Sequence, residues 1–71
     1  MAESVYKIIE LVGTSTESWE KAAQAAVAKA AETLRDLRIA EVEMLDMQIN
    51  NGKIEHYRAK IKVSFKFEGH Q

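Results

Sequence analysis

Few side chains in this 71-residue sequence could act as a base or a nucleophile. Of the two histidines, His56 falls on the polar face of a predicted strand and His70 in the C-terminal tail, and we interpret both as solvated or locally paired imidazoles. Thr14 and Ser15 precede a predicted helix, where hydroxyl groups commonly cap free amides. Cysteine is absent, which excludes thiol catalysis, thiolate metal clusters and disulfides. No nucleophile–base pair is visible, so we do not expect an enzyme.

Charged side chains suggest two other kinds of site. Basic residues alternate along the last predicted strand and could contact an anionic small ligand; they are Arg58, Lys60, Lys62 and Lys66. Aromatic residues of that strand point to the opposite face, so no platform for stacking nucleic-acid bases is expected. Carboxylates could alternatively share a divalent cation between subunits; the candidates are Asp36, Glu41, Glu43 and Asp46. Residues 46–52 lack the ligand spacing of an EF-hand calcium loop.

Composition narrows the class of protein further. The formal net charge of −1 disfavours nucleic acid or an anionic membrane as the main partner. No apolar run approaches the ~18 residues of a membrane-spanning helix, and the N-terminus does not resemble a signal peptide. We therefore expect a cytoplasmic protein with one folded domain over residues 1–71.

Periodicity predicts four elements. Residues 4–12 are rich in β-formers and end at Gly13, which indicates a strand followed by a turn. From 16 to 36, apolar residues recur every three or four positions, as in an amphipathic helix, with Trp19 interpreted as core packing. Residues 38–50 and 53–67 flank Asn51-Gly52, a strong hairpin turn. The connections predict an α+β fold, β-α-β-β, with a three-stranded antiparallel sheet of order 1-3-2 packed on the helix.

The hairpin turn also predicts a register, in which paired residue numbers sum to 103. This register places Glu41 opposite Lys62 and Glu43 opposite Lys60, two pairs of opposite charge. It also places three residues of the second strand on the apolar face, namely Ala40, Val42 and Met44.

The predicted elements leave apolar surface uncovered. The apolar stripe of the helix is mostly alanine, which buries little area, and a 13-residue strand outreaches a 20-residue helix. A chain of this size rarely stabilises itself with a single core. Because disulfides are excluded and no metal-ligand set is evident, we expect self-association.

The sequence resembles the dodecin family over nearly the whole chain. The resemblance is carried by VYKIIELVGTS, the alanine-rich AAQAAVAKAAETL, AEVEMLDM and YRAKIKVSFKFEG, the VGTS and A-E-V pieces being the most specific. It implies β-α-β-β subunits in a hollow homododecamer that binds and stores flavins such as FMN or riboflavin without turnover.

The resemblance also implies a ligand site. The position of the flavin-stacking tryptophan falls at Ile39, and that of a flavin-bonding glutamine at Arg58. A basic position of bacterial flavin-binding members falls at Asp46, and the phosphate-side basic residue is retained as Lys66. SWE at 18–20 and DMQI at 46–49 resemble the branch without that tryptophan, which includes calcium dodecins.

We therefore expect a non-enzymatic binding and storage protein for flavin-like ligands, with flavin affinity weakened or lost. The alternative is a shell that binds calcium or has a purely structural role.

Overall fold

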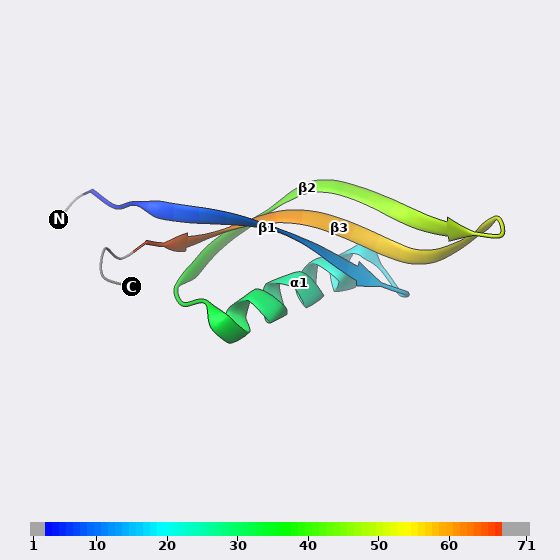
Figure 1. The fold of residues 1–71 in the computed structure, drawn as a ribbon, viewed down its shortest axis with the longest axis horizontal. Coiled ribbons are helices and arrows are strands. Elements are labelled where there is room, and N and C mark those ends of the chain that lie inside the picture. Colours follow the sequence, from blue (N-terminus) through cyan, green and yellow to red (C-terminus); the bar gives the residue numbers. More distant parts are fainter. Residues whose placement is uncertain (1–2, 68–71) are drawn as a thin grey trace.

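The chain forms one three-stranded sheet with a helix on one face (Figure 1). The computed structural model describes residues 3–67. The elements follow in the order β1 (Tyr6–Ser15), α1 (Trp19–Thr33), β2 (Leu37–Asn50) and β3 (Lys53–Lys66). Both neighbours of β3 run antiparallel to it, which gives the order β1-β3-β2. The predicted β-α-β-β fold, the strand order and the central place of the last strand are confirmed.

The predicted helix was too long at both ends. It begins at Trp19 and ends at Thr33, and Ser18 caps it by accepting a hydrogen bond from the backbone N–H of Lys21 at 3.1 Å. Capping by Thr14 or Ser15 is therefore wrong. β1 runs on to Ser15, whose hydroxyl oxygen accepts from the N–H of Glu17 at 3.0 Å in the turn before the helix.

Gly13 lies inside β1, opposite Ala59, and does not end the strand as predicted. A Cβ atom at this position would overlap the carbonyl oxygen of Ala22 and lie 3.1 Å from the Cβ of Ala26. The absence of a side chain therefore lets α1 approach the sheet closely.

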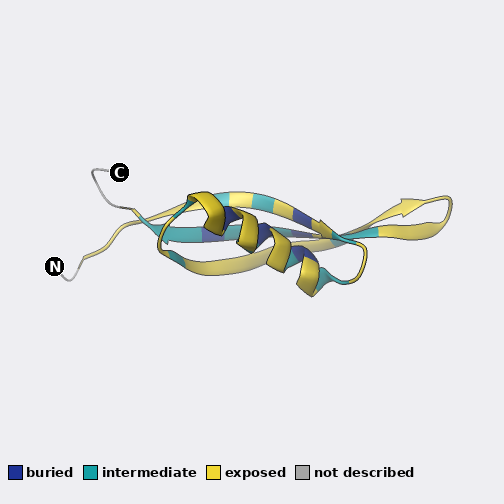
Figure 2. Cartoon of the chain, turned by 90° about the horizontal axis from the view of Figure 1, so that it is seen from below, coloured by how far each residue is buried: buried dark blue, intermediate teal, exposed yellow. Residues whose placement is uncertain are grey.

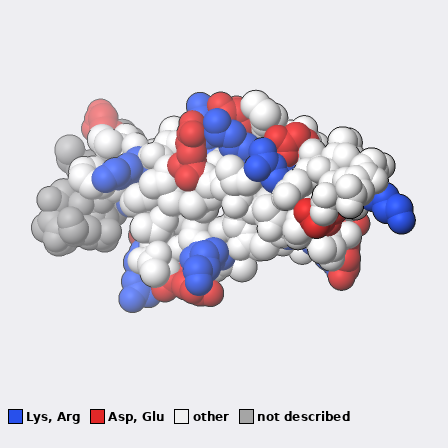
Figure 3. Space-filling view, turned by 45° about the vertical axis from the view of Figure 1, so that its right-hand side comes forward, with Lys and Arg blue, Asp and Glu red and all other residues white. Residues whose placement is uncertain are grey.

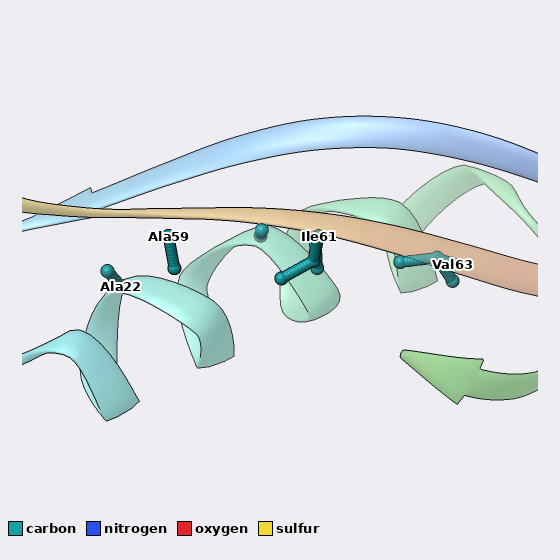
Figure 4. Close-up of a cluster of buried hydrophobic side chains, with 5 residues drawn as sticks. Ala22, Ala59, Ile61 and Val63 are labelled. Atoms are coloured by element: carbon teal, nitrogen blue, oxygen red, sulfur yellow. The ribbon is translucent and has the colours of Figure 1, made fainter. Parts of the chain in front are cut away.

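Small side chains form the contact between helix and sheet (Figure 4). The buried residues are Ala22, Ala26 and Ala30 of α1 and Ala59, Ile61 and Val63 of β3. Ile61 and Val63 are the large ones, so the core of the described residues is small, as the alanine stripe predicted.

β2 departs from the predicted register between Met44 and Gln48. Glu41 lies opposite Lys62 as predicted, but pairing shifts between Val42 and Met44, so that Met44 lies opposite Lys60. The predicted pairing of Glu43 with Lys60 and the placement of Met44 on the apolar face are therefore wrong. The extra residue shifts the pairing of the residues that follow it by one, until a second irregularity between Gln48 and Ile49 restores the predicted register.

The hairpin of β2 and β3 extends beyond the helix (Figure 2), and the chain measures 54 × 20 × 15 Å. Large apolar residues are exposed on β1 and along the hairpin; they include Ile8, Val12, Ile39, Val42, Leu45, Ile49 and Ile54. The predicted overhang is confirmed. The helix found in residues 3–67 is too short and too polar to cross a membrane.

Candidate functional site

The face of the sheet opposite α1, here called the outer face, combines a charged centre with apolar edges. Its central strand, β3, contributes Arg58, Lys60, Lys62, Ser64 and Lys66. The paired residues of the flanking strands are Tyr6, Ile8, Glu10, Val12, Thr14, Ile39, Glu41, Met44 and Asp46. Directly paired residues point to the same face of a sheet. Exposed Ile8 and Val12 thus edge one side and Ile39 and Met44 the other.

Asp46 and Arg58 form a two-point ion pair across β2 and β3. Arg58 donates from Nε to Asp46 Oδ1 at 2.8 Å and from Nη2 to Oδ2 at 2.9 Å. The hydrogen bonds from Arg58 lower the pKa of the Asp46 carboxyl, and the same bonds raise the pKa of the guanidinium. Both side chains stay partly open to solvent, so a ligand on the outer face would meet them.

Trp19 holds this part of the hairpin from the other side of the sheet. Its Nε1–H donates to the backbone carbonyl of Asp46 at 3.0 Å. Its ring meets Tyr57 edge-on, with centroids 5.1 Å apart and planes at 73°. The predicted core role is correct only in part, because Trp19 is half-buried and links the start of α1 to the strand that carries Asp46.

Four charged groups occupy the middle of the outer face. Lys62 Nζ lies 3.4 Å from Glu43, and Lys60 Nζ lies 3.9 Å from the same carboxylate. Glu10 of β1 is within 3.9 Å of both lysines. The bulge therefore places Glu43 between the two lysines. In Figure 3, acidic and basic side chains lie next to each other along the upper part of the molecule.

Two hollows lie on the outer face. One, of about 250 Å³, is lined by Val12, Met44, Asp46, Arg58 and Lys60. The other, of about 200 Å³, is lined by Ile8, Ile39, Glu41, Lys62 and Ser64. Each combines apolar walls with charged or hydroxyl groups, as small-molecule sites do.

The four predicted ligand positions lie in two groups. Asp46 and Arg58 touch each other, whereas Ile39 pairs with Ser64, two residues from Lys66 on the same strand. Arg58 and Ser64 are six positions apart in β3, which corresponds to about 20 Å along a strand. One chain therefore does not bring Ile39 and Arg58 to a single ligand.

The predicted carboxylate and histidine candidates do not form a site within the described part of one chain. No cluster of three or more acidic or histidine side chains able to hold a metal ion occurs in residues 3–67. His56 is half-buried, and its Nδ1 lies 3.9 Å from the carboxylate of Glu55 with no hydrogen-bond partner, which is closer to the locally paired than to the solvated alternative. His70 lies outside the described residues.

Sequence reasoning missed Glu10, Val12 and Met44 as parts of the outer face. Glu10 is the one acidic residue of β1 and is flanked by Ile9 and Leu11, and that contrast could have singled it out. Met44 could not have been found from alternation, because the bulge moves it to this face.

Comparison with known proteins agrees with this architecture. The dodecin family profile matches residues 5–68. The chain is 50% identical to the calcium dodecin of Mycobacterium tuberculosis over 64 residues, 89% of each chain. It is 44% identical to the dodecin of Thermus thermophilus, over 90% of this chain and 93% of that one.

Solved structures show the same fold. Dodecin from Streptomyces coelicolor superimposes with a TM-score of 0.90 at 35% identity, covering 96% of this chain and 97% of that one. The fold and the outer face therefore define a small β-α-β-β binding protein. The chain belongs to the dodecin family, a family of non-enzymatic binding proteins.

Proposed function

We propose that this protein binds and stores flavin-like small molecules as a hollow homododecamer in the cytoplasm. The observation that carries this proposal is the outer face, where exposed Ile39 borders one hollow and the Asp46–Arg58 pair borders another. Apolar surface suits a flat ring, and the remaining N–H groups of Arg58 suit its carbonyl oxygens.

The site is completed by a second copy. Because Ile39 and Arg58 lie about 20 Å apart along the sheet, a ligand reaches both kinds of group when two outer faces pack together in opposite directions. Such packing also covers apolar residues that one chain leaves exposed, among them Ile8, Val12 and Met44. This need for a second copy is consistent with the dodecamers of the family.

Flavin affinity is lower here than in dodecins that carry the stacking tryptophan. By the resemblance, Ile39 stands at that position, and an aliphatic side chain lacks the aromatic stacking worth about 0.5–1.5 kcal/mol. Arg58 is also already engaged by Asp46. Both features support the resemblance to the branch that includes calcium dodecins.

The test is a riboflavin titration followed by quenching of flavin fluorescence. We expect quenching at ~10–50 µM riboflavin, and a roughly tenfold gain in affinity for Ile39→Trp. Ile49→Trp is the matched control, because it adds the same ring to the same strand near the hairpin turn. Absence of quenching in both the unchanged protein and Ile39→Trp would overturn the proposal.

A second candidate function, binding of a divalent cation between subunits, is favoured by the 50% identity to a protein named calcium dodecin. Carboxylates such as Glu41 and Asp36 would supply oxygen ligands from different chains. The test compares the Tm of the protein with Ca²⁺ and with a chelator. A bound ligand at ~100 times its Kd raises the free energy of unfolding by ~2.7 kcal/mol, so Ca²⁺ should raise the Tm. Equal Tm values under the two conditions would contradict a calcium site that stabilises the assembly.

A further inference from the structure

A carboxylate lines the hollow in which a ligand would meet Arg58. Asp46 and Arg58 both border the 250 Å³ hollow, with Lys60, Val12 and Met44 completing its wall. Any group that enters this hollow therefore meets a negative charge as well as a positive one. We propose that Asp46 makes the site select uncharged ligands over phosphorylated ones, an inference that rests on the proposed function.

The guanidinium has little capacity left for an anion. Two-point binding to a carboxylate is the geometry in which arginine also binds phosphate. Here Asp46 already occupies the Nε and Nη2 donors at 2.8 and 2.9 Å. A phosphate would have to displace this carboxylate or bind beside it, and both cost affinity.

The neighbouring lysines do not compensate for the engagement of Arg58 by Asp46. Lys60 is shared between Glu10 and Glu43, at 3.8 and 3.9 Å. The central charges of the outer face are three acidic and three basic groups, which sum to zero; they are Glu10, Glu43, Asp46, Arg58, Lys60 and Lys62. A surface without net positive charge does not concentrate a phosphate dianion.

An uncharged ring suits the same groups. The free N–H groups of Arg58 can donate to ring carbonyls, and the remaining lone pairs of Asp46 can accept from a ring N–H. A ligand edge with adjacent donors and acceptors therefore uses the ion pair without breaking it. Riboflavin and FMN form a suitable probe pair, because they share one ring system and differ by the phosphate.

The experiment compares the two affinities on the assembled full-length protein at low and moderate salt. We expect riboflavin to bind at least tenfold more tightly than FMN. The ratio of the two Kd values should shrink with added salt, because salt screens the repulsion between Asp46 and the phosphate of FMN. In Asp46→Asn, which keeps the side-chain shape, we expect the ratio to fall by about tenfold. Glu32→Gln on exposed α1 is the control and should leave the ratio unchanged.

Each outcome separates the two proposals. Equal affinities, or tighter FMN binding, in the unchanged protein overturn the selectivity while leaving flavin binding intact. An unchanged ratio in assembled Asp46→Asn removes Asp46 as its cause. If neither flavin binds, the proposed function and the selectivity both fail. Should Asp46→Asn not assemble, the ratio and its salt dependence in the unchanged protein still decide.

Discussion

The ion pair between Asp46 and Arg58 joins two neighbouring strands at a solvent-accessible position of the outer face. Exposed ion pairs contribute little to stability, because water and salt screen them. The importance of this pair lies in the ligand site, where it fixes which donors and charges a ligand meets. It also gives stability a specific dependence on pH.

Replacing Arg58 with Gln should change the acid side of the stability curve. The pKa of Asp46 lies below its ordinary value because Arg58 hydrogen-bonds the ionised form. The stabilisation is therefore present above the ordinary carboxyl pKa of about 4 and is lost as pH falls through the lowered pKa. We expect Arg58→Gln to lower Tm slightly at pH 7 and by less at about pH 2.

Arg38→Gln is the matched control for this change. Arg38 is exposed on β2, and its substitution removes the same charge without removing the Asp46 contact. Its Tm difference from the unchanged protein should show no such dependence on pH. A pH-independent effect of Arg58→Gln would contradict the role assigned to the pair.

At the residue scale, alternation predicted part of the site. It placed Ile39, Arg58 and Lys66 on one face, in agreement with the observed pairing. The Asp46–Arg58 contact was missed, since a register summing to 103 places Leu45 opposite Arg58. The bulge between Val42 and Met44 shifts this pairing by one residue, and single-sequence periodicity gives no sign of it.

At the element scale, the contact between α1 and β1 depends on small residues. Gly13→Ala should destabilise the protein by about 1–3 kcal/mol, because the new Cβ overlaps the carbonyl oxygen of Ala22 and forces the helix outward. Denaturant unfolding measures this loss. Thr14→Ala, an exposed change at the next residue, should stay within about 0.5 kcal/mol. Equal stability of Gly13→Ala and the unchanged protein would contradict the close approach.

Periodicity predicted the elements better than their ends. The stripe of Ala22, Ala26 and Ala30 identified the buried face of the helix correctly. The helix start was misplaced because Thr14, Ser15 and Ser18 are all acceptable caps by type. Continued pairing of β1 with β3 decides among them, and that is a tertiary contact.

At the scale of the whole molecule, the described chain buries little and exposes much. Its core holds six buried residues, four of them alanine. The half-open groove beside α1, about 350 Å³ and lined by Trp19, Ala23, Val42 and Leu45 among others, adds apolar surface on the helix side of the sheet. Since small cores contribute few kcal/mol, we expect neighbouring copies to supply the rest of the stability. Length and composition alone predicted this need, whereas the number twelve comes from the family.

Sedimentation velocity of the purified full-length protein at ~10 µM subunit tests this requirement for neighbouring copies most directly. We expect a single species at twelve times the 8.0 kDa subunit mass, with no folded monomer at detectable concentration. A stable, well-folded 8.0 kDa monomer would contradict both the assembly and the ligand site that two outer faces complete.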